Sequence, residues 1–171
     1  MVNDEGLILI EKSKKGDAHA FSQLYSMYSN EMYRYALYMT GNQQDAEDSV
    51  QEAVISAWRS IHNLKDDNKF KVWLFKILTN KCKTLLIKGN KGHDTLPVEE
   101  YDFISAEGDF TVGAELKAAL QDLTPPDGQI IILSIIGGFT SEELSQIYNM
   151  KPSTIRSRQR RGLERLKAIL S

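Results

Sequence analysis

The sequence has few of the features that anchor or cross-link a protein. Its 171 residues include a single cysteine, Cys82, which excludes an internal disulfide. No stretch reaches the roughly 18 apolar residues of a membrane span, and near the N-terminus an apolar run ends at Ile10, where charged residues resume. We therefore expect a cytoplasmic protein with no stable membrane insertion.

Residue patterns that support catalysis or metal binding are also missing. There is no glycine-rich phosphate loop, and neither Cys82 nor His93 has a partner that would orient a nucleophile. His19 and His62 stand alone in the sequence. Cys82 lies in a helical pattern without a Cys or His at metal-ligand spacing, so we expect a buried or half-buried thiol. The sequence predicts no enzyme, no metal site and no cofactor.

The amount of charge is ordinary, but its distribution along the chain is uneven. The chain is 42% hydrophobic and 26% charged, which is typical of a soluble globular protein. The net charge is −2, yet residues 65–93 hold eight basic and two acidic residues, and residues 151–171 hold seven basic and one acidic. Residues 94–150 hold eleven acidic residues and one basic. Two basic islands in an acidic chain indicate two anion-binding surfaces and a surface that meets a basic partner.

Apolar residues recur at helical spacing in three N-terminal stretches. The first is expected to form one helix over residues 17–41, with Asp17 as its N-cap. The second covers residues 42–61, and the third runs from residue 70 to about residue 89. A polar loop over residues 62–68 separates these two. No convincing period-two run is present, so the sequence predicts an all-α protein.

The chain is expected to fold as two lobes. Residues 89–113 lose helical periodicity and collect glycine, proline and acidic residues, as a linker does. The sequence therefore predicts two small helical lobes, residues 1–88 and 114–171, joined by an acidic linker. In the second lobe a short helix over residues 114–123 precedes the run IIILSII, which predicts a buried helix that ends at two glycines.

The sequence from Thr140 onward has the spacing of a helix-turn-helix. Thr140 and Glu143 are spaced as a capping box for a helix of about eight residues. Asn149 suits the left-handed residue at its end, and Pro152 suits the first turn of a longer helix. This longer helix is predicted to enter the major groove of duplex DNA.

The predicted recognition helix has an apolar and a polar side. Its inward stripe is predicted to be Ile155, Leu163, Leu166, Ile169 and Leu170. The residues expected at base edges are Ser153, Arg156, Ser157 and Arg160. The residues expected at phosphates are Thr154, Arg158, Arg161 and Arg165. The alternative is a solvated arginine face that binds nothing, but the capping box and turn upstream favour DNA binding.

Two helices of the first lobe carry opposite charges. Asp45, Asp48 and Glu52 recur at steps of three and four on one face, with no lysine or arginine among them. Such an acidic stripe is either solvent-facing or reserved for a basic protein surface. The next helix combines basic, polar and aromatic residues, which suits single-stranded DNA: Lys69, Trp73, Phe75, Lys76, Asn80 and Lys83. Trp73 is also on the apolar stripe, so a core position is the better single explanation for it.

Three segments together resemble a known family. They are DAEDSVQEAVISAW at residues 45–58, KFKVWLFKILTNK at 69–81, and residues 123–170, which begin LTPPDGQ. Their order and spacing resemble those of the extracytoplasmic-function (ECF) sigma factors, the smallest group of the primary sigma family of bacterial RNA polymerase. The resemblance covers residues 11–170 and is therefore more specific than a helix-turn-helix alone.

The resemblance implies a role for each surface. Residues that match the docking site for the clamp helices of the largest core-polymerase subunit are Asp45, Asp48, Gln51 and Glu52. Residues that match the capture of a flipped −10 base and the melted strand are Lys65, Asn68, Lys69, Trp73, Lys76, Asn80 and Lys83. The first lobe thus corresponds to sigma region 2, and the second to sigma region 4, which reads the −35 element of promoter DNA and meets the polymerase flap. The family also implies an anti-sigma factor as a further partner.

Four positions depart from the usual pattern of the family. Thr84 and Ile87 stand where the family commonly has an aspartate and an arginine. Gly128 stands where an arginine is usual, and Gln159 replaces a usually apolar residue of the recognition helix.

Two other classes of protein fit parts of the sequence. One is a helix-turn-helix regulator that dimerises through its N-terminal half and binds a palindrome. The other is an enzyme with a DNA-binding tail. Initiation that depends on core polymerase would separate the sigma-factor hypothesis from both.

Overall fold

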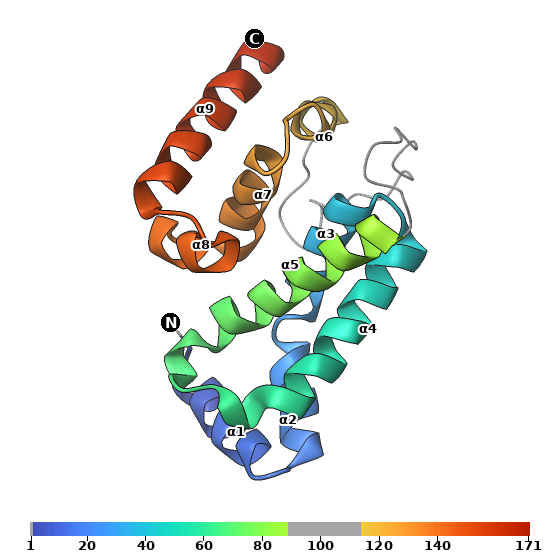
Figure 1. The fold of residues 1–171 in the computed structure, drawn as a ribbon, viewed down its shortest axis with the longest axis vertical. Helices are drawn as coiled ribbons and strands as arrows, with labels where there is room; N and C mark the ends of the chain where they lie inside the picture. Colours follow the sequence, from blue (N-terminus) through green and yellow to red (C-terminus); the bar gives the residue numbers. More distant parts are fainter. Residues whose placement is uncertain (1, 89–113) are drawn as a thin grey trace.

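The structure, a computed structural model, describes residues 2–88 and 114–171, which form two groups of helices (Figure 1). The first lobe consists of α1 (Asp4–Lys14), α2 (Ala18–Ser26), α3 (Ser29–Thr40), α4 (Gln43–Ser60) and α5 (Phe70–Lys88). Two 3-10 turns, η1 (Ile61–Asn63) and η2 (Asp67–Lys69), join α4 to α5. The second lobe consists of α6 (Ala114–Gln121), α7 (Asp127–Gly137), α8 (Ser141–Tyr148) and α9 (Pro152–Leu170). The predicted all-α fold with two lobes is confirmed, while the predicted linker lies outside the described residues.

The structure confirms several predicted helix ends. Asp17 caps α2 by accepting a hydrogen bond from the amide of Ala20 at 3.0 Å. Gly41 ends α3 with a left-handed φ of 82°, a conformation that glycine adopts without steric cost. The next residue, Asn42, caps α4 and accepts a hydrogen bond from the amide of Asp45 at 2.9 Å. A two-residue connection therefore reverses the chain between α3 and α4.

The prediction of one helix over residues 17–41 is wrong. α2 ends at Ser26 and α3 begins at Ser29. Between them the amides of Met27 and Tyr28 bond to carbonyls three residues earlier, which tightens the end of α2. Hydrophobic periodicity records which residues are buried and not the direction of the helix axis. It therefore misses a break at which both helices keep their buried residues in phase.

Helix α1 has no counterpart among the sequence predictions. Its apolar residues are consecutive rather than spaced at helical intervals, so they give no amphipathic signal. In the structure Leu9 and Ile10 are buried, whereas Ile8 is 54% exposed. Asn3 caps the helix by accepting the amide of Gly6 at 2.8 Å.

The segment predicted as a polar loop, residues 62–68, overlaps the two 3-10 turns and contains one buried side chain, Leu64. Lys14 at the end of α1 holds this segment in place. Its ammonium donates to the carbonyl of Leu64 at 2.7 Å and pairs with the carboxylate of Asp67. The segment at residues 62–68 is thus fixed to α1 by two polar contacts.

The core of the first lobe lies where α3, α4 and α5 pack together. Its large, fully buried side chains include Tyr35, Phe70, Phe75 and Leu78. Cys82 is also fully buried, as predicted. Burial raises the pKa of its thiol to about 12, so the thiol is protonated and unreactive at neutral pH.

The core of the second lobe is built around α7. Ile130, Ile131, Ile132 and Leu133 are all buried, which confirms the predicted buried helix, although Ile135 is 42% exposed. α9 crosses α7 closely at Gly162, where a Cβ atom would lie 2.3 Å from Cδ1 of Ile131. Glycine in a helix costs about 1 kcal/mol relative to alanine, and the close crossing explains why it is present here.

The predicted inward stripe of α9 is partly wrong. Ile155 and Leu166 are buried, but Leu163, Ile169 and Leu170 are 55%, 42% and 43% exposed. The buried face runs through Gly162 instead of Leu163. A stripe built from large apolar side chains alone passes over a glycine at the contact, and this shifted the predicted face by one residue.

The two lobes lie against each other along α3 and α5. α7 packs against α3 and α8 packs against α5, so α5 lies between α4 and the second lobe (Figure 1). No helix in the described part of the chain is long and apolar enough to cross a membrane.

Candidate nucleic-acid interface

The helix-turn-helix has the geometry that the sequence predicts. The hydroxyl of Thr140 accepts the amide of Glu143 at 3.2 Å, and the carboxylate of Glu143 accepts the amide of Thr140 at 2.9 Å. Asn149 ends α8 in the left-handed conformation with a φ of 53°, and Pro152 occupies the first turn of α9. The angle between α8 and α9 is therefore fixed by the local backbone and its caps.

The N-terminal half of α9 presents a polar face to solvent. All four residues predicted to meet base edges are exposed: Ser153, Arg156, Ser157 and Arg160. Arg156 pairs with Glu142 of α8 at 3.6 Å, an exposed contact that orients the guanidinium and costs little to break. The arginine fork and the small hydroxyls are suited to the acceptors of a guanine edge and to close approach in the major groove.

The residues predicted at phosphates have a second role inside the lobe. Arg158 and Arg161 donate to the carboxylate of Asp127, which is 4% exposed, at 2.9 and 3.1 Å. Arg165 pairs with Asp122 at 3.3 Å. These contacts join α9 to the start of α7 and to the residue after α6, and Arg161 still exposes 63% of its side chain. The structure thus ties Arg158 to the lobe more firmly than the sequence suggests.

The basic face of the first lobe is largely solvent-exposed. The exposed members of the predicted single-strand site are Lys65, Asn68, Lys69, Lys76, Asn80 and Lys83. Trp73 is half-buried and packs against Phe70 with the ring centroids 5.9 Å apart, so it belongs to the edge of the core and also reaches the surface. The ammonium of Lys83 lies 5.2 Å from the ring centroid of Tyr148 in α8. One lysine of the set is therefore directed toward the second lobe.

The acidic stripe of α4 differs from its prediction at one position. Asp45 is only 9% exposed, and its carboxylate accepts a hydrogen bond from the side-chain amide Nδ2 of Asn42 at 2.8 Å. Asp45 is thus part of the cap of α4, because its carboxylate and its backbone amide both bond to the side chain of Asn42. Gln51 and Glu52 are exposed and Asp48 is half-buried.

Basic residues of a neighbouring helix lie beside the acidic stripe, although none lies within it. Helix α5 brings Lys81 and Lys88 beside it, and the two helices line a surface pocket of about 530 Å³ that includes Asp48 and Glu52. Sequence spacing misses these lysines because they lie in another helix. The antiparallel pairing of α4 with α5 is the feature that brings them together.

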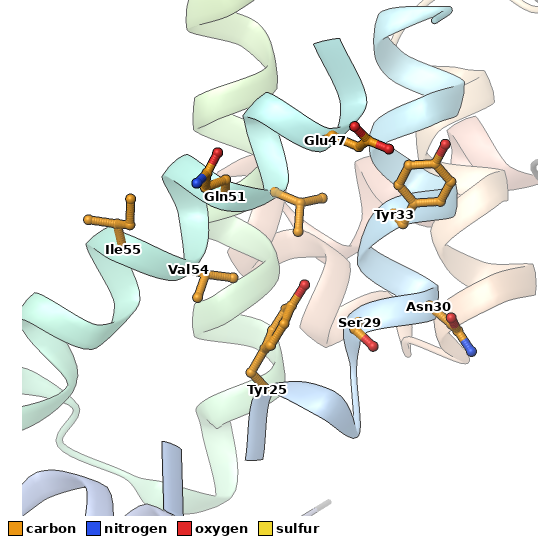
Figure 2. Close-up of a pocket in the computed structure, with 9 residues that line it drawn as sticks. Tyr25, Ser29, Asn30, Tyr33, Glu47, Gln51, Val54 and Ile55 are labelled. Carbon is orange, nitrogen blue, oxygen red and sulfur yellow. The ribbon is translucent and has the colours of Figure 1, made fainter. Parts of the chain in front are cut away.

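A second groove lies on the opposite flank of α4. Figure 2 shows Glu47 of α4 beside Tyr33 of α3 and Val54 of α4 near Tyr25 of α2, with Gln51 and Ile55 further along α4. The groove has a volume of about 480 Å³ and is lined largely by apolar atoms. Gln51 lines both this groove and the pocket beside α5, so the exposed ridge of α4 has an acidic flank and an apolar flank.

The positions that depart from the family pattern have varied surroundings. Ile87 is 80% exposed near the end of α5, and Thr84 is exposed beside the acidic stripe. The amide of Gln159 donates to the hydroxyl of Ser134 at 2.9 Å and accepts from the hydroxyl of Ser141 at 3.2 Å. Gln159 therefore links α7, α8 and α9, which explains a polar residue at a usually apolar position.

A helix-turn-helix with an exposed arginine face, attached to a lobe that has an acidic ridge and a basic face, defines a two-lobed DNA-binding protein. Residues 24–91 match the family model for Sigma-70 region 2, and residues 119–168 match the model for Sigma-70 region 4. The chain is 34% identical over 161 residues to the ECF RNA polymerase sigma factor SigE of Mycolicibacterium smegmatis, covering 89% of this chain and 62% of that protein. It is 31% identical over 176 residues to the ECF RNA polymerase sigma factor SigW of Bacillus subtilis, covering 94% of each.

The chain belongs to the ECF RNA polymerase sigma factors. Sigma factors are non-catalytic initiation subunits of RNA polymerase, which accounts for the absence of enzymatic residue patterns from the sequence. Among solved structures, the chain is similar to one from the co-crystal of the sigma factor RpoE with the anti-sigma factor NepR from Bartonella quintana. The TM-score is 0.74 at 26% identity, covering 88% of this chain and 96% of that one. The structure of CnrH in complex with the cytosolic domain of CnrY shares the fold, with a TM-score of 0.72 at 20% identity, covering 98% and 97%.

Proposed function

We propose that the two lobes hold two separate promoter elements while the first lobe is docked on core RNA polymerase. Residues 1–88 act on polymerase and the −10 element, residues 114–171 act on the −35 element, and residues 89–113 connect them. The observation that carries this proposal is the exposed face of α9, where Arg156 and Arg160 lie near the hydroxyls of two serines. The turn before α9 follows a helix, α8, that is capped at both ends.

The core-polymerase contact is assigned to the exposed ridge of α4. Asp48, Gln51 and Glu52 supply the polar contacts, and Asp45 supports them by fixing the first turn of the helix. A basic surface on the largest polymerase subunit is the complementary partner. The clamp helices of that subunit fit this description.

The −10 contact is assigned to the segment at residues 62–68 and to the exposed side of α5. Lys65, Lys69, Lys76 and Lys83 follow the phosphates, and Asn68, Trp73 and Asn80 contact the exposed bases. Stacking of a base on an aromatic ring is worth about 1 to 3 kcal/mol. This energy offsets part of the cost of opening the duplex, so that melting is driven by binding rather than by a reaction.

The −35 contact is assigned to α9. Ser153, Arg156, Ser157 and Arg160 meet base edges, and Thr154, Arg158 and Arg161 lie toward the phosphates. The second lobe also contacts the polymerase flap. Two of its arginines, Arg158 and Arg161, are held by the buried carboxylate of Asp127, which keeps them positioned before DNA arrives.

An anti-sigma factor is the proposed regulatory partner. The chain resembles a sigma factor that was crystallised in complex with an anti-sigma factor. Such a partner would cover the exposed polymerase-binding and DNA-binding faces until it is released. The cytoplasm, where polymerase and promoter DNA are found, is the proposed location.

Run-off transcription with purified core polymerase tests the proposed function. The chain is expected to direct initiation at a subset of promoters in a library, and only when core polymerase is present. A symmetric footprint on a palindrome by the free chain, with no core-dependent transcript, would instead establish a dimeric helix-turn-helix regulator.

The substitution Lys76→Ala tests the −10 assignment. Lys76 is exposed on α5, so its loss removes a phosphate contact without opening the core. Open-complex formation is expected to weaken by about 1 kcal/mol, roughly fivefold, while core binding is unchanged. Permanganate reactivity of the bubble measures the effect. Lys12→Ala on α1 is the matched control, and an equal loss in both variants would contradict the assignment.

A further inference from the structure

The segment that joins α4 to α5 has an anchored side and an exposed side. Side chains of the anchored side recur at every third position, which is the period of a 3-10 helix: Ile61, Leu64, Asp67 and Phe70. The three apolar side chains of this set are buried, and the carboxylate pairs with α1. The residues between them are exposed: His62, Asn63, Lys65, Asp66, Asn68 and Lys69. The segment therefore presents its polar side chains from a backbone that is held at regular intervals.

Lys14, the last residue of α1, links the two 3-10 turns of this segment. Its ammonium donates to the carbonyl of Leu64, at the end of η1, and pairs with the carboxylate of Asp67, in η2. α1 also packs against both turns (Figure 1). Only 26% of the Lys14 side chain is exposed, whereas the neighbouring Lys15 is 74% exposed and pairs with Glu11 of the same helix. The position of the Lys14 ammonium is thus determined by the segment that it holds.

The same contact changes the charge that the segment presents. Its two lysines are offset by two carboxylates, Asp66 and Asp67. A free carboxylate repels the phosphates of a nucleic-acid strand, and pairing with Lys14 neutralises that of Asp67. The carboxylate of Asp66 accepts a hydrogen bond from the backbone amide of Asn68 at 3.0 Å. Both acidic side chains therefore fix the segment itself, and its lysines remain available to a strand.

Asn68 is the exposed residue that this anchoring affects most directly. It follows Asp67 in the chain, and its backbone amide is held by Asp66. An amide side chain has a donor side and an acceptor side, and it can form two hydrogen bonds to one base edge. Such a pair of bonds requires a fixed orientation. A segment that is ordered before binding also avoids the entropic cost of becoming ordered on the strand.

We propose that Lys14 is a positioning residue for base recognition in the −10 element and that it acts through Asn68. This proposal rests on the proposed function of the segment. By fixing the Leu64 carbonyl and the Asp67 carboxylate, Lys14 holds the side chain of Asn68 in the orientation that reads a base. Lys14 precedes residue 24, where the match to Sigma-70 region 2 begins. Helix α1 is thus part of the −10 recognition surface without contacting the strand.

Open-complex formation by the chain bound to core polymerase tests this role. The probe is a promoter obtained from the run-off library, together with single-base variants of its −10 element. The readout is the ratio of permanganate reactivity on the original −10 sequence to that on each variant. A change in general charge affects all these sequences equally and cancels in the ratio, because phosphate contacts carry no sequence information.

Lys14→Met removes the ammonium and keeps a side chain of similar length. It is expected to lower the ratio about fivefold at one −10 position. Lys15→Met is the matched control, because it removes the same charge from the next residue of the chain, and its ratio is expected to stay unchanged. Circular dichroism, thermal melting and a core-polymerase pull-down establish that each variant is folded and docked.

A double-mutant cycle measures whether Lys14 acts through Asn68. Asn68→Ala alone is expected to lower the ratio at the same −10 position. Adding Lys14→Met to Asn68→Ala is then expected to lower it no further, because the side chain that Lys14 positions is already absent. Losses that multiply, or that fall at different −10 positions, would overturn the proposal.

Asp67→Ala distinguishes positioning from a direct phosphate contact of Lys14, and it covers the case in which Lys14→Met does not fold. A lysine that served phosphates would be freed by this substitution, so binding would strengthen equally on every sequence and the ratio would stay constant. A positioning lysine loses an anchor, so the ratio is expected to fall at the same position as in Lys14→Met. An unchanged ratio in the folded variants would overturn the proposal.

The variants Lys76→Ala and Asn68→Ala separate this proposal from the −10 assignment itself. If both impair opening or base preference while the Lys14 and Asp67 variants keep normal ratios, the positioning role is wrong and the −10 assignment stands. If both behave as the unmodified chain does, the −10 assignment fails and the positioning role fails with it.

Discussion

The substitution Asp48→Lys is expected to abolish binding to core RNA polymerase. Asp48 lies half-buried at the centre of the exposed ridge of α4, with Glu52 one turn away. Reversing its charge both removes a contact and places a like charge against the proposed basic partner. The loss expected is about 3 kcal/mol or more, roughly a hundredfold in affinity. A pull-down with purified core polymerase measures it.

Glu11→Lys provides the control for this experiment. Glu11 is an exposed acidic residue of α1 that pairs with Lys15, and its reversal changes the net charge of the chain by the same amount. Core binding by Glu11→Lys should stay within a few-fold of normal. DNA binding by the second lobe of the Asp48→Lys variant should be unchanged. Unaltered core affinity in Asp48→Lys would show that the ridge of α4 is not the docking surface.

The substitution Arg156→Ala is expected to weaken −35 recognition by about 1 to 3 kcal/mol and to relax preference at one base pair. Arg156 is exposed near the N-terminus of α9, where a recognition helix contacts base edges. Its pair with Glu142 is exposed on both sides, so the loss of that pair should leave the stability of the lobe nearly unchanged. Affinities for a series of single-base variants of the −35 element measure the effect.

Arg165→Ala separates base recognition from general charge. Arg165 lies more than two turns further along α9 and is similarly exposed, with Asp122 as its partner. Its loss is expected to weaken binding by a similar factor on every sequence, as a phosphate contact does. If Arg156→Ala also weakens all sequences equally, Arg156 is a phosphate contact and the base assignment is wrong.

Two predicted site residues lie on the helices and faces that the sequence predicts but have contacts that it does not predict. Asp45 is on the predicted helix and in the predicted phase, yet it is buried and bonds to the capping side chain of Asn42. Arg158 is on the predicted face of α9, yet it bonds to Asp127 of α7. In both cases the sequence identifies the position on the helix, but the neighbouring helix decides whether the side chain is available to a partner.

Local signals in the sequence determine most of the elements. A cap side chain bonds to an amide three residues away, and a left-handed residue ends a helix by its own backbone preference. The N-terminal ends of α4 and α8 follow from such caps at Asn42 and Thr140, and Pro152 suits the first turn of α9. Hydrophobic spacing adds the buried face of a helix that continues without interruption, and it is misled where a helix breaks, as at Met27, or where a glycine occupies the contact, as at Gly162.

The sequence by itself determined that this chain is helical, has two lobes and carries two basic surfaces and an acidic ridge, because each follows from residues close together in the chain. Only the tertiary structure decided that Lys81 and Lys88 border that ridge and that Tyr38 lies against Gly128. These contacts join residues far apart in sequence, and they depend on how whole helices pack. No local pattern encodes a distance between helices, so the closed arrangement of the lobes emerges only from the three-dimensional structure.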